Sequence, residues 1–368
     1  MPTRSPRDAD LPAPPEELAA SLLGWYRRAA RELPWRGLED PYAIWVSEVM
    51  LQQTQVATVL GYYDRFLREF PTVAALAQAE LPAVLARWSG LGYYGRARAL
   101  HAAAREIAAR GAFPTTLEGL RELPGFGPYT AAAVGSIAFG LPEPAIDGNA
   151  VRVYGRLVGL RAPRPAAEKR LRELARPILA VGPASEINQA VMDLGAGLCA
   201  TQAPACLLCP WRGPCRARRL GIQAEIPLPV QRPARRALSW AAAVLRDRKG
   251  RLLFARRPEK GLFAGLWELP GGEARARESL PAALARLLES ELGLRAEVGT
   301  ELGSVSQALT HRSLRIVAFE ARARGRPKAR GYLEARWASA AEARELALSS
   351  ATRKLLASLP PTAPSPRR

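Results

Sequence analysis

The position of the cysteines restricts the fold of this chain more than any other feature of its sequence. All four cysteines lie between residues 199 and 215, as Cys199, Cys206, Cys209 and Cys215. With no cysteine elsewhere, no disulfide framework can hold other parts of the chain together. Four thiolates on one short loop are typical of a metal site, which would pin that loop rigidly.

The spacing of the four cysteines, C-x6-C-x2-C-x5-C, favours one of two metal sites. Zinc is often held by four cysteines, but these usually form two C-x2-C pairs, and only Cys206 and Cys209 form one here. A 4Fe–4S cluster also takes four cysteines, so the spacing favours iron–sulfur, with zinc as the alternative. Several arginines beside Cys215 predict that the loop grips phosphate: Arg212, Arg216, Arg218 and Arg219.

The hydrophobic pattern changes once along the chain, which indicates two domains. In the first part, apolar residues recur every three or four positions, as at Leu18, Leu22 and Trp25, and Pro and Gly separate the segments. This pattern predicts a domain built of helices alone. The stretch GIQAEIPLPVQRPARR then holds three prolines and no helical period, and we predict a linker there.

The part after the linker has a different pattern. Strand-like runs are expected at 239–246, 251–256 and 314–321, and a helix with one leucine-rich face is expected from Leu280 to Leu292. This order predicts a small α/β domain. The predicted segments are a disordered tail over 1–14, a helical domain over 15–220, a linker over 221–236, an α/β domain over 237–358 and a disordered tail over 359–368.

The net charge of +19 favours a polyanionic partner, although a generally arginine-rich proteome is an alternative explanation. No run of 18 apolar residues exists, so we expect no membrane span. Residues 1–14 lack the apolar core of a signal peptide. We therefore expect a soluble intracellular protein.

The segment LPGFGPYTAA, residues 123–132, predicts a tight hairpin before a helix. Gly125 and Gly127 bracket Phe126, and glycines let a backbone approach a ligand closely. The free amides at the following helix start, near Pro128, can bind a phosphate oxygen. An ordinary glycine-rich turn between two helices is the alternative.

Two carboxylates lie in apolar sequence, where such groups are unusual. Glu48 lies in WVSEVMLQQTQV, and Asp147 lies in AIDGNAVRV. Taken alone, the residues favour ordinary roles for both. Asp147 would cap the N-terminus of a helix, and Glu48 would be one polar position on an amphipathic helix.

Taken together, the cysteine spacing, the hairpin, SEVMLQQTQV and DGN resemble the MutY family, the adenine-removing branch of the endonuclease III superfamily. The resemblance covers about residues 17–357. It implies an all-α helix-hairpin-helix glycosylase domain with a 4Fe–4S cluster loop, and a monovalent cation beside the hairpin. The implied substrate is double-stranded DNA with adenine opposite 8-oxoguanine or guanine. The resemblance further implies a monomeric protein of bacterial type, located in the cytoplasm and associated with the nucleoid.

The resemblance also implies roles for single residues. Glu48 is implied as the acid that protonates adenine, and Asp147 as the anion that faces the sugar cation, with Tyr129 and Asn149 in support. Bifunctional relatives have lysine at the place of Tyr129, so we predict a monofunctional enzyme that leaves an abasic site. The implied adenine pocket comprises Trp35, Arg36 and Gln189. The implied DNA and lesion contacts are Gln53, Thr54, Leu91, Tyr93, Gly125, Gly127, Thr310 and His311.

The C-terminal part resembles a Nudix domain. The residues that fit its helix motif are Gly272, Glu278, Arg286, Glu291, Gly293 and Leu294. Leu287 and Ser290 replace two glutamates that bind divalent cations in Nudix enzymes, so we predict no pyrophosphohydrolase activity. The resemblance to the MutY family implies that this domain recognises 8-oxoguanine. The Phe-Ser-His loop of MutY proteins corresponds here to Leu309, Thr310 and His311, so the aromatic ring is absent.

Two other functions are compatible with parts of this pattern. A thymine-mismatch or bifunctional glycosylase of the same superfamily would share the cysteines and the hairpin, but Tyr129 and the Nudix-like half argue against it. A non-catalytic DNA-binding protein with a redox cluster would not need Glu48 and Asp147.

Overall fold

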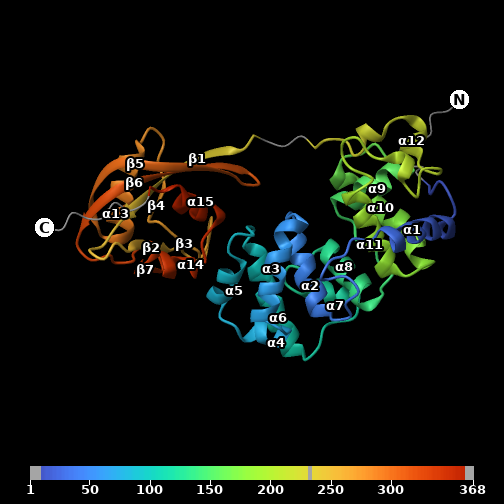
Figure 1. Cartoon of the computed structure of the whole chain (residues 1–368), viewed down its shortest axis with the longest axis horizontal. Coiled ribbons are helices and arrows are strands. Elements are labelled where there is room, and N and C mark those ends of the chain that lie inside the picture. Colours follow the sequence, from blue (N-terminus) through green and yellow to red (C-terminus); the bar gives the residue numbers. More distant parts are fainter. Residues whose placement is uncertain (1–9, 231–233, 361–368) are drawn as a thin grey trace. The chain divides into compact units, whose positions relative to one another are not determined.

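The computed structural model describes residues 10–230 and 234–360, and these residues form two compact units (Figure 1). The helical unit comprises residues up to 78 and residues 99–231. The sheet unit comprises residues 79–98 and the chain from 232 onward. Three parts of the predicted disordered and linker segments lie outside the described residues: 1–9 of the predicted tail 1–14, 231–233 of the predicted linker, and 361–368 of the predicted tail 359–368.

The described part of the helical unit contains helices and turns but no named strand, as the sequence predicts. Its helices are α1 (Pro15–Ala29), α2 (Pro41–Leu51), α3 (Val56–Glu69), α4 (Val73–Gln78), α7 (Leu117–Glu122), α8 (Pro128–Phe139), α9 (Gly148–Val158), α10 (Arg164–Ala180), α11 (Ala184–Ala196) and α12 (Arg216–Leu220). Two short 3-10 turns, η1 (Cys206–Leu208) and η2 (Gln223–Glu225), complete it. Helix α6 (Gly95–Arg110) begins in the sheet unit and ends in the helical unit.

One hydrophobic core joins α1, α9, α10 and α11 of the helical unit. Trp211 of the cysteine loop is buried in this core, and its indole nitrogen donates to the carbonyl of Leu18 at 2.9 Å. Leu11 and Ala13 pack against the same core, so the described end of the predicted N-terminal tail is ordered. Burial of these apolar side chains attaches both segments to the helices.

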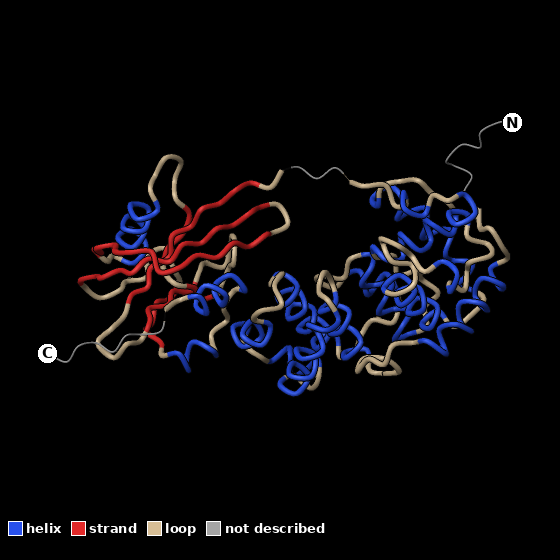
Figure 2. Tube along the Cα trace, turned by 45° about the horizontal axis from the view of Figure 1, so that its top comes forward, coloured by secondary structure: helices blue, strands red, loops and turns tan. Residues whose placement is uncertain are grey.

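The sheet unit contains two sheets, seen as the red strands in Figure 2. The four-stranded sheet has the order β4-β1-β6-β5, and the three-stranded sheet has the order β3-β2-β7. The strands are β1 (Arg236–Leu245), β2 (Leu252–Arg256), β3 (Trp267–Glu268), β4 (Gly271–Glu273), β5 (Arg295–Ala308), β6 (Arg312–Arg324) and β7 (Glu334–Ala338). The helices are α5 (Leu81–Trp88), α13 (Leu280–Leu292), α14 (Ala340–Arg344) and α15 (Ser350–Ser358).

The predicted elements of this unit are confirmed as β1, β2, α13 and β6. Strands β1 and β6 pair in parallel, from Arg236 opposite Arg312 to Leu245 opposite Ala321. Leu284, Leu288 and Leu292 of α13 are buried against this sheet. An α/β domain with its core between one helix face and a sheet is therefore present.

Residues 79–98 pack with the C-terminal residues, whereas the sequence predicts one unbroken helical domain over 15–220. The hydroxyls of Ser89 and Tyr94 both donate to the carbonyl of Leu348, at 2.6 and 2.7 Å. The hydroxyl of Ser350 donates in turn to the carbonyl of Gly90 at 3.2 Å. Hydrogen bonds between segments so far apart leave no trace in hydrophobic periodicity, which reports local structure alone.

None of the helices in the described ranges combines the length and the apolar character that a membrane crossing needs.

Candidate active site

Glu48 lies on α2, a helix that is buried on all sides. Every side chain from Tyr42 to Met50 is buried, and Glu48 itself is only 5% exposed. The helix begins where the carboxylate of Asp40 accepts from the amides of Tyr42 and Ala43, at 2.9 and 3.3 Å. Glu48 is therefore no solvent-facing position of an amphipathic helix, and its burial needs another explanation.

The partner of Glu48 is Tyr129, at the first turn of α8. The Tyr129 hydroxyl donates to Oε2 of Glu48 at 2.8 Å, which leaves Oε1 to carry a proton. Burial raises the pKa of Glu48, while the Tyr129 hydrogen bond and the charge of Arg36 act in the opposite direction. Because desolvation is the largest cause, the side chain keeps its proton to higher pH than an exposed glutamate does.

Asp147 caps α9 and faces the same cavity. Its carboxylate accepts from the amide of Ala150 at 2.7 Å, so the ordinary capping role is confirmed. Burial raises the pKa of Asp147, whereas the amides of Ala150 and Asn149 and the charge of Arg164 favour the anion. A carboxylate held by backbone amides at a helix N-terminus is a fixed negative charge, and it can serve as cap and reactant at once.

A cavity of about 160 Å³ brings the predicted catalytic residues together. The predicted residues that line it are Trp35, Arg36, Glu48, Thr54, Tyr129, Asp147, Asn149 and Gln189. They come from α2, α8, α11, the start of α9 with its N-cap, the segment between α1 and α2, and the turn between α2 and α3. A proton donor and a fixed anion in one cavity can cleave a bond whose two fragments develop opposite charges.

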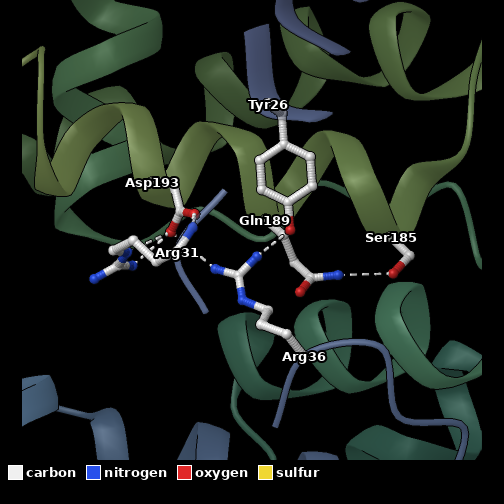
Figure 3. A network of polar contacts seen from close by, with 6 residues as sticks. All are labelled: Tyr26, Arg31, Arg36, Ser185, Gln189 and Asp193. Atoms are coloured by element: carbon white, nitrogen blue, oxygen red, sulfur yellow. Dashed lines mark hydrogen bonds and ion pairs between the residues drawn. The ribbon is translucent and has the colours of Figure 1, made fainter. Parts of the chain in front are cut away.

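Residues that the sequence analysis missed hold the side chains of this cavity wall from behind (Figure 3). Asp193 of α11 is bound by Arg31 Nε at 2.9 Å and by Arg36 Nη2 at 2.8 Å. Tyr26 accepts a hydrogen bond from Arg36, and Gln189 donates to Ser185 at 2.9 Å. The sequence does contain a signal for Asp193, because this carboxylate lies in the apolar stretch QAVMDLGA. It is as unusual there as Glu48 is in its own helix.

Arg152 is a second missed residue. Its Nη2 donates to Oδ1 of Asn149 at 2.8 Å and to the carbonyl of Gly195 at 2.6 Å, and its Nε donates to the carbonyl of Cys199 at 2.8 Å. It therefore links the end of α9 that carries Asp147 to the first cysteine. One arginine among many in this chain gave no sequence signal for this role.

All four cysteines face one small cavity of about 30 Å³. Arg156 donates to the Cys199 sulfur at 3.4 Å, and burial raises the pKa of the Cys209 thiol to about 12. Buried thiolates need a cation beside them, so the donor set fits a bound metal group. Among the described residues, no three side chains of the cysteine, histidine or carboxylate type are placed to hold a single metal ion.

Gly125 of the predicted hairpin has a structural requirement for glycine. Its φ of +79° favours glycine, and a Cβ there would lie 2.7 Å from Cβ of Ala99. Gly127 precedes α8 as its N-cap, with open space where a Cβ would be. Phe126 between them is buried against Trp45, at 5.3 Å between ring centroids. The hairpin is thus built as predicted, while its phosphate contact stays a prediction.

The sheet unit has a larger cavity of about 700 Å³. Tyr93 and Thr310 line it, while Leu91, also in its wall, is only 6% exposed and acts as packing. Tyr93 is 47% exposed and has a φ of +49°, and the guanidinium of Arg96 lies 5.3 Å from its ring centroid. The backbone strain and the stacked cation fix this ring at the mouth of the cavity.

Two further predicted contacts lie on the surface. Gln53 is exposed with a φ of +57°, in the turn after α2 of the helical unit. His311 is exposed in the turn between β5 and β6, where its carbonyl accepts from the amide of Arg236. Neither residue lines the cavity that holds Glu48 and Asp147 or the larger cavity of the sheet unit.

Leu287 and Ser290 stand where the Nudix helix motif has two glutamates. Arg286 forms two hydrogen bonds with Glu278, at 2.7 and 2.8 Å, and these help to lower the pKa of Glu278 to about 2. Leu287 lies on the side of α13 that faces Gly272, and Ser290 bonds to the neighbouring Glu291 at 3.1 Å. The motif's arginine and first glutamate therefore stabilise the loop before α13.

Two family models match the chain. Residues 46–178 match the HhH-GPD superfamily base excision DNA repair proteins, and residues 241–358 match the NUDIX domain. The first match contains Glu48, the hairpin and Asp147, and the second covers most of the sheet unit.

Curated relatives extend this similarity over most of the chain. The adenine DNA glycosylase of Rattus norvegicus is 34% identical over 393 residues, which cover 91% of this chain and 76% of that protein. The adenine DNA glycosylase of Homo sapiens is 35% identical over 396 residues, with 91% and 72% covered. Among solved structures, a thermostable thymine-DNA glycosylase aligns with a TM-score of 0.51 and 28% identity, over 56% of this chain and 97% of that one.

Proposed function

Because the chain belongs to the adenine DNA glycosylases, enzymes of base excision repair that hydrolyse N-glycosidic bonds, we propose that it removes adenine paired with 8-oxoguanine or guanine. The observation that carries this proposal is the single buried cavity lined by both Glu48 and Asp147. Such a site needs the adenine outside the helix, since neither carboxylate could reach a stacked base.

The proposed reaction uses the two carboxylates in sequence. Glu48 gives its proton to adenine N7, and the electron pair of the bond to the sugar leaves with the base. The positive charge that develops on the sugar faces the carboxylate of Asp147. Water then adds to the sugar carbon and returns a proton to Glu48, so the products are free adenine and an abasic site.

We expect the enzyme to leave the DNA strand intact. Strand cleavage by related enzymes uses a lysine amine that attacks the sugar, and Tyr129 stands at the corresponding position here. The Tyr129 hydroxyl is engaged with Glu48, and no lysine is among the described residues that line the cavity.

A duplex with one adenine opposite 8-oxoguanine tests this function directly. We expect strand scission only after treatment with alkali, and the same result more slowly with adenine opposite guanine. Scission without alkali would indicate a bifunctional enzyme, and release of thymine in place of adenine would indicate the alternative glycosylase. No base release from any mispair would overturn the proposal.

The cysteine loop supports a 4Fe–4S cluster held by Cys199, Cys206, Cys209 and Cys215. When bound, such a cluster supplies cross-links that hold the loop to the helical core. The four cysteines would each hold one iron of such a cluster, whereas a single zinc ion would take all four thiolates. Trp211 and Arg156 already anchor the loop on two sides.

The metal can be identified on the purified protein. We expect a brown colour, an absorbance band at about 400 nm from thiolate-bound iron, and about four irons per chain. A colourless protein with one zinc per chain would contradict the iron–sulfur assignment. The loop of each cysteine-to-serine variant should become sensitive to proteolysis, because the pinning group is lost.

We propose that the sheet unit reads the base opposite the adenine. Tyr93 is an exposed aromatic ring fixed by Arg96, and Thr310 offers a hydroxyl in the same cavity wall. The ring can stack on a base, and the hydroxyl can donate to an oxidised purine. We further infer that the hairpin of Gly125 and Gly127 holds the DNA backbone, with a monovalent cation beside it.

Tyr93→Ala is expected to weaken binding to DNA with adenine opposite 8-oxoguanine by about 5- to 150-fold, since stacking on one base contributes roughly 1–3 kcal/mol. Gel-shift titration measures this. Tyr62→Ala is the matched control, because Tyr62 also carries a stacked arginine, Arg65 at 4.8 Å, but lines neither cavity. Equal losses in both variants would contradict the assigned role of Tyr93.

A further inference from the structure

Asp193 is a buried carboxylate that the proposed reaction does not use. It lies on α11, is 4% exposed, and takes hydrogen bonds from two guanidinium groups (Figure 3). Arg31 donates through Nε at 2.9 Å, and Arg36 through Nη2 at 2.8 Å. A buried ion pair contributes little net stability, because the desolvation of its charges offsets their attraction, so stability alone does not explain it.

The two arginines connect Asp193 to the cavity. Both line it, whereas Asp193 itself does not and lies behind them. Arg36 is held at a second point, because its Nη1 donates to the hydroxyl of Tyr26. A planar guanidinium bound at both terminal nitrogens cannot rotate, and it presents its edge to the cavity in one orientation.

The charges around Glu48 come from every side of the cavity. Tyr129 of α8 and Asp147 at the start of α9 face it, as do Arg31 and Arg36 from the segment before α2. Arg36 favours the charged form of Glu48 and so lowers its pKa, against the larger effect of burial. The carboxylate of Asp193 offsets that positive charge at hydrogen-bond distance.

We propose that Asp193 is a positioning residue of the adenine site, which fixes the guanidinium of Arg36 at the cavity wall and offsets its charge beside Glu48. The inference rests on the proposed function and deepens it. A guanidinium only donates hydrogen bonds, and the ring nitrogens of adenine accept them. A guanidinium held in a fixed orientation can therefore hydrogen-bond to these ring nitrogens. Without the counter-charge, the same guanidinium favours the deprotonated acid, which cannot start the reaction.

Asp193→Asn tests this role through the pH dependence of adenine release in single turnovers. The substitution keeps the shape of the side chain but removes the charge, so Arg36 acts on Glu48 without its offset. The pKa of Glu48 then falls, and the alkaline limb of the profile should move to lower pH by about one unit. At pH 8 the variant should therefore lose about tenfold more activity than it loses at pH 5.5.

Glu186→Gln is the matched control on the same helix. Glu186 pairs with Arg27 at 2.9 Å in an ion pair whose arginine is 61% exposed, so its loss should leave the profile unchanged. A uniform loss of rate in Asp193→Asn, with its alkaline limb in place, would show a structural role only and overturn the inference. Failure of the unaltered chain to release adenine would instead overturn the proposed function.

A double variant keeps the test valid where Asp193→Asn does not fold, as judged by circular dichroism. Arg36→Gln alone removes the positive charge, so its alkaline limb should move to higher pH. Arg36→Gln with Asp193→Asn removes both members of one ion pair, which buried pairs tolerate better than the loss of one. Arg31, the other partner of Asp193, has a side chain that is 38% exposed, so water can solvate it. The two removed charges have opposite signs, so their effects on the pKa of Glu48 oppose one another, and the limb of the double variant should lie at lower pH than that of Arg36→Gln. A limb that stays at the position found for Arg36→Gln would show that the charge of Asp193 does not act on Glu48, and would overturn the inference.

Discussion

Replacing Glu48 by glutamine is expected to slow adenine release by about a thousandfold, the middle of the range that a positioned general acid contributes to catalysis. The leaving adenine would then depart without its proton and carry the full negative charge of the broken bond. Single-turnover release from a duplex with adenine opposite 8-oxoguanine measures the effect. The unaltered rate in this variant would remove Glu48 from the mechanism.

The glutamine variant should fold and bind DNA normally. The Tyr129 hydroxyl can donate to the amide oxygen of glutamine as it does to Oε2 of Glu48. The folded-state pKa of Glu48 is raised, so its contribution to stability is present at low pH and is lost as the pH rises through that pKa. A neutral amide has no such loss, and we expect the variant to melt at the same or a higher temperature than the parent above pH 7.

The pH profile gives a second readout of the same acid. Activity requires protonated Glu48, so the rate should fall as the pH rises through its raised pKa. Tyr129→Phe removes the hydrogen bond that favours the charged form, so the alkaline limb should move to higher pH. A limb that moves to lower pH in this variant would contradict the assigned direction.

The sequence alone predicts the architecture better than the chemistry. Periodicity places β1, β2, β6 and α13, because each has one apolar face or a short apolar run. Strand β5 (Arg295–Ala308) is not predicted from periodicity, because none of its residues is buried and it has no fully apolar face. Half-buried and exposed positions alternate along much of it, and bulges interrupt its register with β6.

Asp147 shows why the residues alone could not identify the site. The sequence alone favours a helix cap, and the structure confirms the cap. The catalytic prediction came from the resemblance, and only the fold shows that the capping carboxylate also lines the cavity with Glu48. Both explanations hold, because a cap binds one side of the carboxylate and leaves the other side open.

Contacts between distant segments were beyond the sequence. Asp193 meets Arg31 and Arg36 across more than 150 residues of chain, and Ser89 meets Leu348 across 259. These pairs depend on how helices and loops pack, which periodicity and spacing do not encode. The one local feature of such a network that a sequence shows is an acidic residue within an apolar stretch, and Asp193 is such a residue.

Asp147→Asn is expected to reduce adenine release by about a hundredfold to a thousandfold, because the variant loses the fixed anion that stabilises the developing sugar cation. The substitution separates charge from structure. Asparagine caps helices as well as aspartate does, so the bond to the amide of Ala150 and the start of α9 should be kept. The rate is measured as for the Glu48 variant, on the same duplex and with saturating enzyme.

Asp40→Asn is the matched control for this variant, since Asp40 caps α2 through two amides and does not line the cavity. Its rate should stay within about twofold of the parent, as surface caps exchange aspartate for asparagine at little cost.

Because burial raises the pKa of Asp147, the parent should lose activity as the pH falls and this carboxylate takes up a proton. That acidic limb should be absent from the residual activity of Asp147→Asn. An acidic limb that persists there, or a rate equal to that of the Asp40 variant, would mean that Asp147 only caps its helix and that another group stabilises the cation.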